Sequence, residues 1–129
     1  MAQIKIYGIR EKLNPIKAQM SDVIHSAVVE VFQFPPDKRF HRFFSMDKED
    51  FIYANGRSDA YTIIEISMFE GRTADTKKQL IRLLFRTFKE QLGISPEDLE
   101  ITIFETPKHN WGIRGVPGDE LALNYKVNV

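Results

Sequence analysis

The sequence repeats itself at a spacing of 60 positions, and this repeat constrains the fold more than any other feature. Residues of like type recur at that spacing without a gap: Ile4 and Ile64, Ile6 and Ile66, Lys17 and Lys77, Met20 and Leu80, Ile24 and Leu84, Pro36 and Pro96, Asp37 and Glu97. Each repeat holds an alternating apolar run, an amphipathic stretch, a proline-containing turn and a second apolar run. Each half therefore predicts one β-α-β unit, and the chain combines two of them.

The first half predicts a strand, a helix and a returning strand. Residues 4–9 alternate apolar and polar side chains, as a half-buried strand does. Pro15 indicates the start of the helix, because proline is tolerated where its missing N–H costs least. Apolar residues at helical spacing continue to about Phe32, and two prolines at 35–36 end the helix. Residues 39–46 are expected to form the returning strand.

The second half predicts the same order of elements. A strand is expected over residues 61–69 and another over residues 99–105. The helix between them has Thr73 or Asp75 as its expected N-cap. Gly93 is the expected stop at the C-terminal end of this helix.

These elements predict a single domain over residues 1–129. The pseudo-repeats cover residues 2–46 and 61–105. A polar linker with an Asn-Gly turn signal occupies residues 47–60, and an irregular tail occupies residues 106–129. A chain of 129 residues is long enough for one hydrophobic core but not for two.

The predicted fold class is α+β, with a four-stranded mixed sheet and two helices on one face. Both helices lie on the same face because β-α-β crossovers are right-handed. The other face of the sheet stays uncovered, yet neighbouring pairs such as Ile63 with Ile64 and Phe43 with Phe44 place apolar side chains on both faces. We therefore expect an oligomer that buries the bare face.

The composition argues against several classes of protein. Lys+Arg and Asp+Glu are both 18, so the formal charge is zero and a nucleic-acid partner is not expected. No apolar run approaches the roughly 20 residues of a membrane span, and no apolar signal-peptide stretch follows the first residues. Without cysteine, and with histidines that lack metal-binding spacing, we expect no metal, no cofactor and a cytoplasmic location.

Three segments together carry a family resemblance. They are Asp37-Lys38-Arg39-Phe40 after the prolines, Gly71-Arg72-Thr73 at the second helix start, and Trp111-Gly112 near the end. In order and spacing they resemble the tautomerase superfamily, in the branch of malonate semialdehyde decarboxylase. The resemblance covers almost the whole chain. It implies a homotrimer, which agrees with the bare sheet face, and a proton-transfer enzyme that acts on a small keto or enol carboxylic acid.

The sequence departs from the family pattern at its beginning. Members of the family use an N-terminal proline as acid or base, whereas the second residue here is Ala2. Two further departures concern charged positions: Lys38 aligns with the acidic residue that activates water in the decarboxylase, and Glu70 aligns with one of its two substrate-binding arginines. If the initiator methionine is removed, the free amine of Ala2 is a candidate catalytic group; otherwise this end is a frayed terminus.

Arg72 is the principal candidate for binding substrate. A guanidinium at a helix start can hold a carboxylate through two parallel hydrogen bonds, with help from the backbone N–H groups. The alternative is a solvated or salt-bridged arginine. By resemblance Arg39 and Phe40 border the pocket, although such a basic cluster is usually a solvated surface. Trp111 is either a pocket wall or core filling, and His109 and Arg114 beside it are candidates for further substrate-binding contacts.

Three functions follow from these features. The first is a tautomerase-superfamily protein that binds a small keto or enol carboxylic acid, with tautomerase or decarboxylase activity through its N-terminal amine. The second is a non-catalytic trimeric binding or scaffold protein that has lost the catalytic proline. The third is a ferredoxin-like regulatory or RNA-binding module, which the neutral charge disfavours. Strand order distinguishes the third, because in the tautomerase arrangement each helix joins two parallel neighbours.

Overall fold

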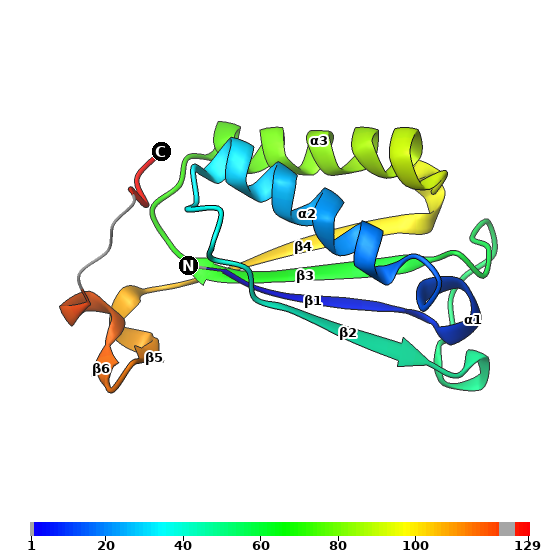
Figure 1. Cartoon of the computed structure of the whole chain (residues 1–129), viewed down its shortest axis with the longest axis horizontal. Coiled ribbons are helices and arrows are strands. Elements are labelled where there is room, and N and C mark those ends of the chain that lie inside the picture. The colour runs from blue at the N-terminus through cyan, green and yellow to red at the C-terminus, as the bar shows by residue number, and fades with distance from the viewer. Residues whose placement is uncertain (1, 122–125) are drawn as a thin grey trace.

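The computed structural model describes residues 2–121 and 126–129, which form a sheet with two long helices on one face (Figure 1). The strands of the sheet are β1 (Ala2–Ile9), β2 (His41–Met46), β3 (Thr62–Phe69) and β4 (Leu99–Thr106). The helices are α1 (Arg10–Leu13), α2 (Lys17–Phe32) and α3 (Ala74–Leu92). After β4, the short strands β5 (Gly112–Ile113) and β6 (Val116–Pro117) form a small hairpin.

The strand order confirms the predicted α+β architecture. The four strands lie in the order β2-β1-β3-β4, with β1 parallel to β2, β3 parallel to β4, and β1 antiparallel to β3. Each long helix therefore joins two parallel neighbours, which is the tautomerase arrangement and not the ferredoxin-like one. The central strands start at Ala2 and Thr62, so the repeat seen in the sequence reappears as two β-α-β units.

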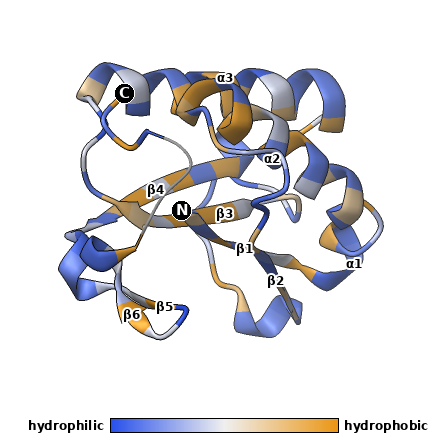
Figure 2. Ribbon diagram, turned by 60° about the vertical axis from the view of Figure 1, so that its left-hand side comes forward, coloured by the Kyte–Doolittle hydropathy of each residue, from blue (hydrophilic) through white to orange (hydrophobic). Residues whose placement is uncertain are grey.

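The core lies between the sheet and the two long helices. Every second residue of the central strands faces the helices and is buried, because successive side chains in a strand point to opposite faces. The largest fully buried side chains of this core are Ile6, Ile64, Ile66 and Met68 in the sheet and Met20, Ile24, Phe32, Leu80, Leu84 and Phe88 in the helices. In Figure 2, hydrophobic residues run along β3 and β4, whereas much of the outer surface of α3 is hydrophilic.

The predicted start of the first long helix at Pro15 is wrong. The backbone N–H of Asn14 donates to the carbonyl of Arg10 at 3.0 Å, which closes the short helix α1. Pro15 has no N–H to donate, and it lies in the turn that separates α1 from α2. Tertiary packing explains the extra helix, since it buries Leu13 against the core.

The predicted ends of the second long helix are confirmed. The Thr73 side chain accepts a hydrogen bond from the backbone N–H of Thr76 at 3.1 Å, and so it caps the first turn of α3. Gly93 follows the last turn with a φ of 67°, a left-handed conformation that glycine adopts at little cost.

The segment between β2 and β3 is less polar than the sequence indicated. Phe51 and Tyr61 are buried there, with their rings stacked at 5.6 Å between centroids, and they pack with Ile9. The sheet face opposite the helices is uncovered around the exposed rings of Phe44 and Phe104. No helix among the described residues is long and apolar enough to cross a membrane.

Candidate functional site

The strand directions bring the predicted site residues to one end of the sheet. Ala2 starts β1 and pairs with Met68 near the end of β3, so the chain beginning lies beside the segment that leads to Arg72. The first residue of β2 is paired with Ile4. The end of β4, which leads toward Trp111, is paired with the end of β3. Figure 1 shows this end at the left, with the N-terminus beside the tip of β3.

Arg72 is buried at this end, with only 5% of its surface exposed. Its guanidinium carbon lies 4.6 Å from the ring centre of Phe32 and 4.8 Å from the ring centre of Phe34. The Nε, Nη1 and Nη2 atoms have no hydrogen-bond acceptor within the described part of the chain. A buried guanidinium ordinarily has acceptors, because leaving its N–H groups unsatisfied costs free energy. The arrangement is suited to an anion that the described residues do not supply.

Burial changes the ionisation of this arginine. Loss of solvent lowers the pKa of Arg72 to about 10, and the negative charge of Glu105 partly opposes that change. Arg72 therefore remains a cation at neutral pH. The carboxylate of Glu105 is itself engaged, because the amine of Lys77 lies 2.5 Å from it.

The chain already occupies part of the N-terminal end of α3. The main-chain oxygen of Val129 accepts hydrogen bonds from the backbone N–H of Thr73 at 3.1 Å and from the Thr76 hydroxyl at 3.0 Å. The backbone N–H of Thr76 donates to the Thr73 side chain. Two backbone N–H groups at this helix start thus have partners in the protein, whereas the guanidinium nitrogens of Arg72 have no acceptor among the described residues.

The last described residues cover the turn that carries Arg72. Val127 is buried in a cluster with Phe69, Trp111 and Ile113, defined here as the tail cluster. Gly71 has a φ of 134°, and a Cβ placed on it would lie 2.5 Å from the Asn128 side chain. The tail therefore closes over the turn between β3 and α3 at close range.

Ala2 is buried in the main core cluster, although its side chain is only a methyl group. The cluster also contains Phe32 and Phe34, the two residues that contact Arg72. Through the pairing of Ala2 with Met68, the start of β1 lies near the residues that precede Arg72. The structure thus places Ala2 and Arg72 at the same edge of the core.

The predicted residues before β2 have other partners. Arg39 donates to Asp22 at 2.6 Å and to the Ser21 hydroxyl at 3.4 Å, so its charge is partly compensated on the surface. Phe40 is exposed, and its carbonyl accepts the backbone N–H of Ile4 at 3.0 Å.

The predicted residues after β4 divide into one packed and two exposed side chains. Trp111 packs against Phe69 with ring centres 5.1 Å apart and belongs to the tail cluster. His109 is exposed in a short 3₁₀ turn, Lys108–Asn110. Arg114 is exposed in the β5–β6 turn, with a φ of 51°. Of the three, Trp111 is the one that packs in a hydrophobic cluster, a contact compatible with either core filling or a pocket wall.

The sequence reasoning missed two groups. The first group is the pair of rings of Phe32 and Phe34 around Arg72; the sequence shows both residues at the predicted helix end, just before two prolines, but not their contact with Arg72. The second group is a polar pair in which the Ser21 hydroxyl lies 2.7 Å from Nδ1 of His41. Burial, together with the positive charge of Arg39, lowers the pKa of His41 to about 4, so this ring is neutral at pH 7.

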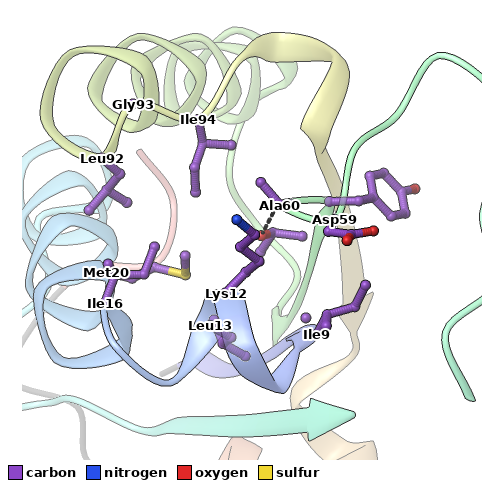
Figure 3. Close-up of a pocket in the computed structure, with 13 residues that line it drawn as sticks. Ile9, Lys12, Leu13, Ile16, Met20, Asp59, Ala60, Leu92, Gly93 and Ile94 are labelled. Carbon is purple, nitrogen blue, oxygen red and sulfur yellow. Dashed lines mark hydrogen bonds between the residues drawn. The ribbon is translucent and has the colours of Figure 1, made fainter. Parts of the chain in front are cut away.

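A cavity of about 170 Å³ lies at the end of the sheet opposite Arg72 (Figure 3). Its walls are largely aliphatic, from α1, α2 and the end of α3: Leu13, Ile16, Met20, Leu92 and Ile94. The charged groups at its edge are Lys12 and Asp59. Asp59 is held by the Tyr53 hydroxyl and by Lys48, so it is not directed at a ligand. We place the candidate site at Arg72.

A metal site is not supported by the donor groups. Within the described residues, Asp47, Glu49 and Asp50 form the group close enough to hold an ion, but all three are exposed. Asp47 is also paired with Arg10 at 3.2 Å. Exposed acidic groups of this kind are common on surfaces, and they lie outside the Arg72 end of the sheet.

Comparison with known sequences points to one family. The sequence model of a family described as "Tautomerase enzyme" matches residues 38–114, which is more than half of the chain. A 2-hydroxymuconate tautomerase from Comamonas testosteroni is 39% identical over 58 residues, a match that covers 45% of this chain and 92% of that protein.

Solved structures agree with the fold. A malonate semialdehyde decarboxylase inhibited by 3-bromopropiolate is 25% identical, with a TM-score of 0.81, and the match covers 94% of this chain and 98% of that one. A fused 4-OT described as an asymmetric trimer is 21% identical, with a TM-score of 0.78 and coverage of 91% and 96%. At that level of identity the second likeness supports the fold alone.

Proposed function

Because the chain belongs to the tautomerase family, we propose that it binds a small keto or enol carboxylic acid at Arg72. The supporting observation is the buried guanidinium of Arg72, which has no acceptor among the described residues. A carboxylate would supply two acceptor oxygens to its N–H groups and would neutralise its charge. Trp111 and Phe69 would form an apolar wall nearby.

Proton transfer is proposed for the amine of Ala2, after removal of the initiator methionine. An α-amine has a pKa of roughly 7.7–8.0 in model peptides, so it can exchange a proton near neutral pH. The amine would take the proton of the enol hydroxyl and return a proton to carbon, which yields the keto acid. A primary amine rotates more freely than proline, so we expect slower turnover than with a proline in this position.

The test is an assay with phenylenolpyruvate or 2-hydroxymuconate on the wild type and on Ala2→Pro. We expect weak turnover by the wild type and faster turnover by the variant. No turnover by either protein would remove the amine mechanism. Loss of turnover in Arg72→Gln, with Arg86→Gln as a matched exposed control on α3, would support the carboxylate site.

A second candidate is a non-catalytic binding or scaffold protein. The observation that favours it is Ala2 itself, which stands where members of the family have the catalytic proline. Measurement of the intact mass separates the two functions, because a retained methionine leaves no free amine at Ala2. In that case binding of the carboxylate at Arg72 would persist without turnover.

We also propose that the protein is a homotrimer through its bare sheet face. Phe44 and Phe104 expose 41% and 49% of their surface there, and a monomer leaves these rings in water. A structural neighbour of similar fold is described as a trimer.

A further inference from the structure

On the basis of the proposed carboxylate site, we infer that Phe32 and Phe34 are positioning residues for Arg72. Their rings hold the guanidinium as a cation and leave its N–H groups free for the ligand. We define these two rings as the aromatic corner, since their planes meet at 80° with centroids 6.0 Å apart.

A buried arginine is usually stabilised by a carboxylate, which also occupies its donors. Arg72 differs, because no described residue accepts from its three nitrogen atoms. The nearest acidic influence is Glu105, and Lys77 is bound to that carboxylate at 2.5 Å. Among the described residues, the acid that influences Arg72 is thus paired with a lysine and accepts no hydrogen bond from the guanidinium.

The aromatic corner supplies a different kind of stabilisation. The guanidinium carbon lies 4.6 Å and 4.8 Å from the two ring centres, within the range of about 6 Å for cation–π attraction. The face of a phenyl ring is electrically negative and attracts a cation without acting as a strong hydrogen-bond acceptor. The charge of Arg72 is partly compensated while its N–H groups stay available.

The backbone places both rings on the same cation. Phe32 is the last residue of α2, and Phe34 follows one residue later. Gln33 between them ends the helix in a left-handed conformation, with a φ of 57°. This conformation is uncommon for a residue other than glycine, and it turns the chain so that both side chains meet Arg72.

The experiment measures binding of phenylpyruvate by calorimetry to the wild type and to variants of Phe34. Phe34→Leu and Phe34→Met keep an apolar side chain but remove the negative ring face. We expect each to bind about ten-fold more weakly, because the guanidinium is then no longer held with its N–H groups toward the ligand; ten-fold corresponds to about 1.4 kcal/mol. Phe34→Tyr keeps the ring and is expected to restore binding. Phe88→Leu, an equivalent loss in the core away from Arg72, is expected to bind as the wild type does.

A spectroscopic measurement tests the geometry without any ligand. Ring currents should shift the Nε–H proton signal of Arg72 upfield in the wild type, and Phe34→Leu should reduce that shift. An unshifted signal in the wild type would overturn the inference, even if every Phe34 variant failed to fold.

The outcomes separate the inference from the proposed function. If Arg72→Gln abolishes binding of phenylpyruvate while Phe34→Leu and Phe34→Met bind normally, the carboxylate site stands and the aromatic corner has no positioning role. If Arg72→Gln binds as the wild type does, the carboxylate site itself fails. Weak binding that Phe34→Tyr does not restore would indicate a packing defect, and this also counts against the inference.

Discussion

At the scale of a residue, Arg72 carries a charge that the fold buries at a cost in stability. Its guanidinium is charged and buried, and its nitrogen atoms find no acceptor among the described residues. Because burial lowers the pKa of Arg72 to about 10, the folded state binds its proton less tightly than the unfolded chain does. Stability attributable to this group therefore rises as the pH increases through 10, and at neutral pH the charge is a cost.

We predict that Arg72→Met stabilises the protein and abolishes carboxylate binding. Methionine fills similar space without a charge, so the free energy of unfolding should increase by about 1–2 kcal/mol. Urea unfolding at pH 7 measures this change, with Arg86→Met as the exposed control. A lower stability for Arg72→Met would show that the aromatic contacts outweigh the cost of burying the charge.

His41 gives a second prediction at the scale of a residue. Its folded pKa of about 4 is below the ordinary value of 6.5, so the unfolded chain binds the proton more tightly between these values. Stability should therefore fall as the pH decreases from 6.5 to 4, by an amount on the order of 1–3 kcal/mol. Urea unfolding over this range should show a smaller loss in His41→Gln, and equal slopes in the two proteins would contradict the assignment.

At the scale of elements, the turn between β3 and α3 joins the strand, the helix and the tail. Gly71 adopts a φ of 134° there, and the Asn128 side chain occupies the space that a Cβ would need. Val129 accepts from the first turn of α3, and Val127 packs with Phe69. The conformation of this short turn and the docking of the tail thus depend on each other.

We predict that Gly71→Ala destabilises the protein more than Gly56→Ala does. Both glycines have positive φ, so each substitution strains the backbone by about 1 kcal/mol. Only at Gly71 does the new methyl group also displace a neighbour, and a further loss of roughly 1 kcal/mol is expected. Urea unfolding of the two variants provides the comparison. Equal decreases in the free energy of unfolding would mean that the Asn128 side chain moves aside without destabilising the protein.

The elements could be predicted from the sequence where a local signal was present. The 60-residue repeat, the Thr73 cap and the Gly93 stop are readable in single residues, and the structure agrees with them. The start of α2 was not readable, because α1 forms through burial of Leu13 against the core. The surroundings of Arg72 depend on contacts across 38 to 40 positions, from Phe34 and Phe32, which no local pattern contains.

At the scale of the whole molecule, the two sheet faces differ. One is covered by α2 and α3 (Figure 1), whereas the other carries exposed aromatic rings beside polar side chains. The Tyr7 hydroxyl donates to Glu65 on that face at 2.8 Å, and the Tyr7 ring stacks on Phe44 at 4.8 Å. Such a mixed surface is typical of a protein–protein contact between copies.

We predict a particle of three times the chain mass of 15.0 kDa in sedimentation at micromolar concentration. Replacing Phe104 with serine should weaken the assembly, since it removes an apolar ring from the bare face. Ile52→Ser is the control, because Ile52 is 92% exposed on the linker outside the sheet. A 15.0 kDa particle for the wild type would contradict the trimer.

The packing of Trp111 makes the protein its own optical reporter. It is the single tryptophan of the chain, and its ring meets Phe69 edge-on in the cluster that also holds Val127. Its fluorescence emission is therefore sensitive to whether Val127 stays packed in this cluster. A red shift when a carboxylate is added would mean that water reaches the indole, and that the chain end lifts as the ligand enters, without any dye attached.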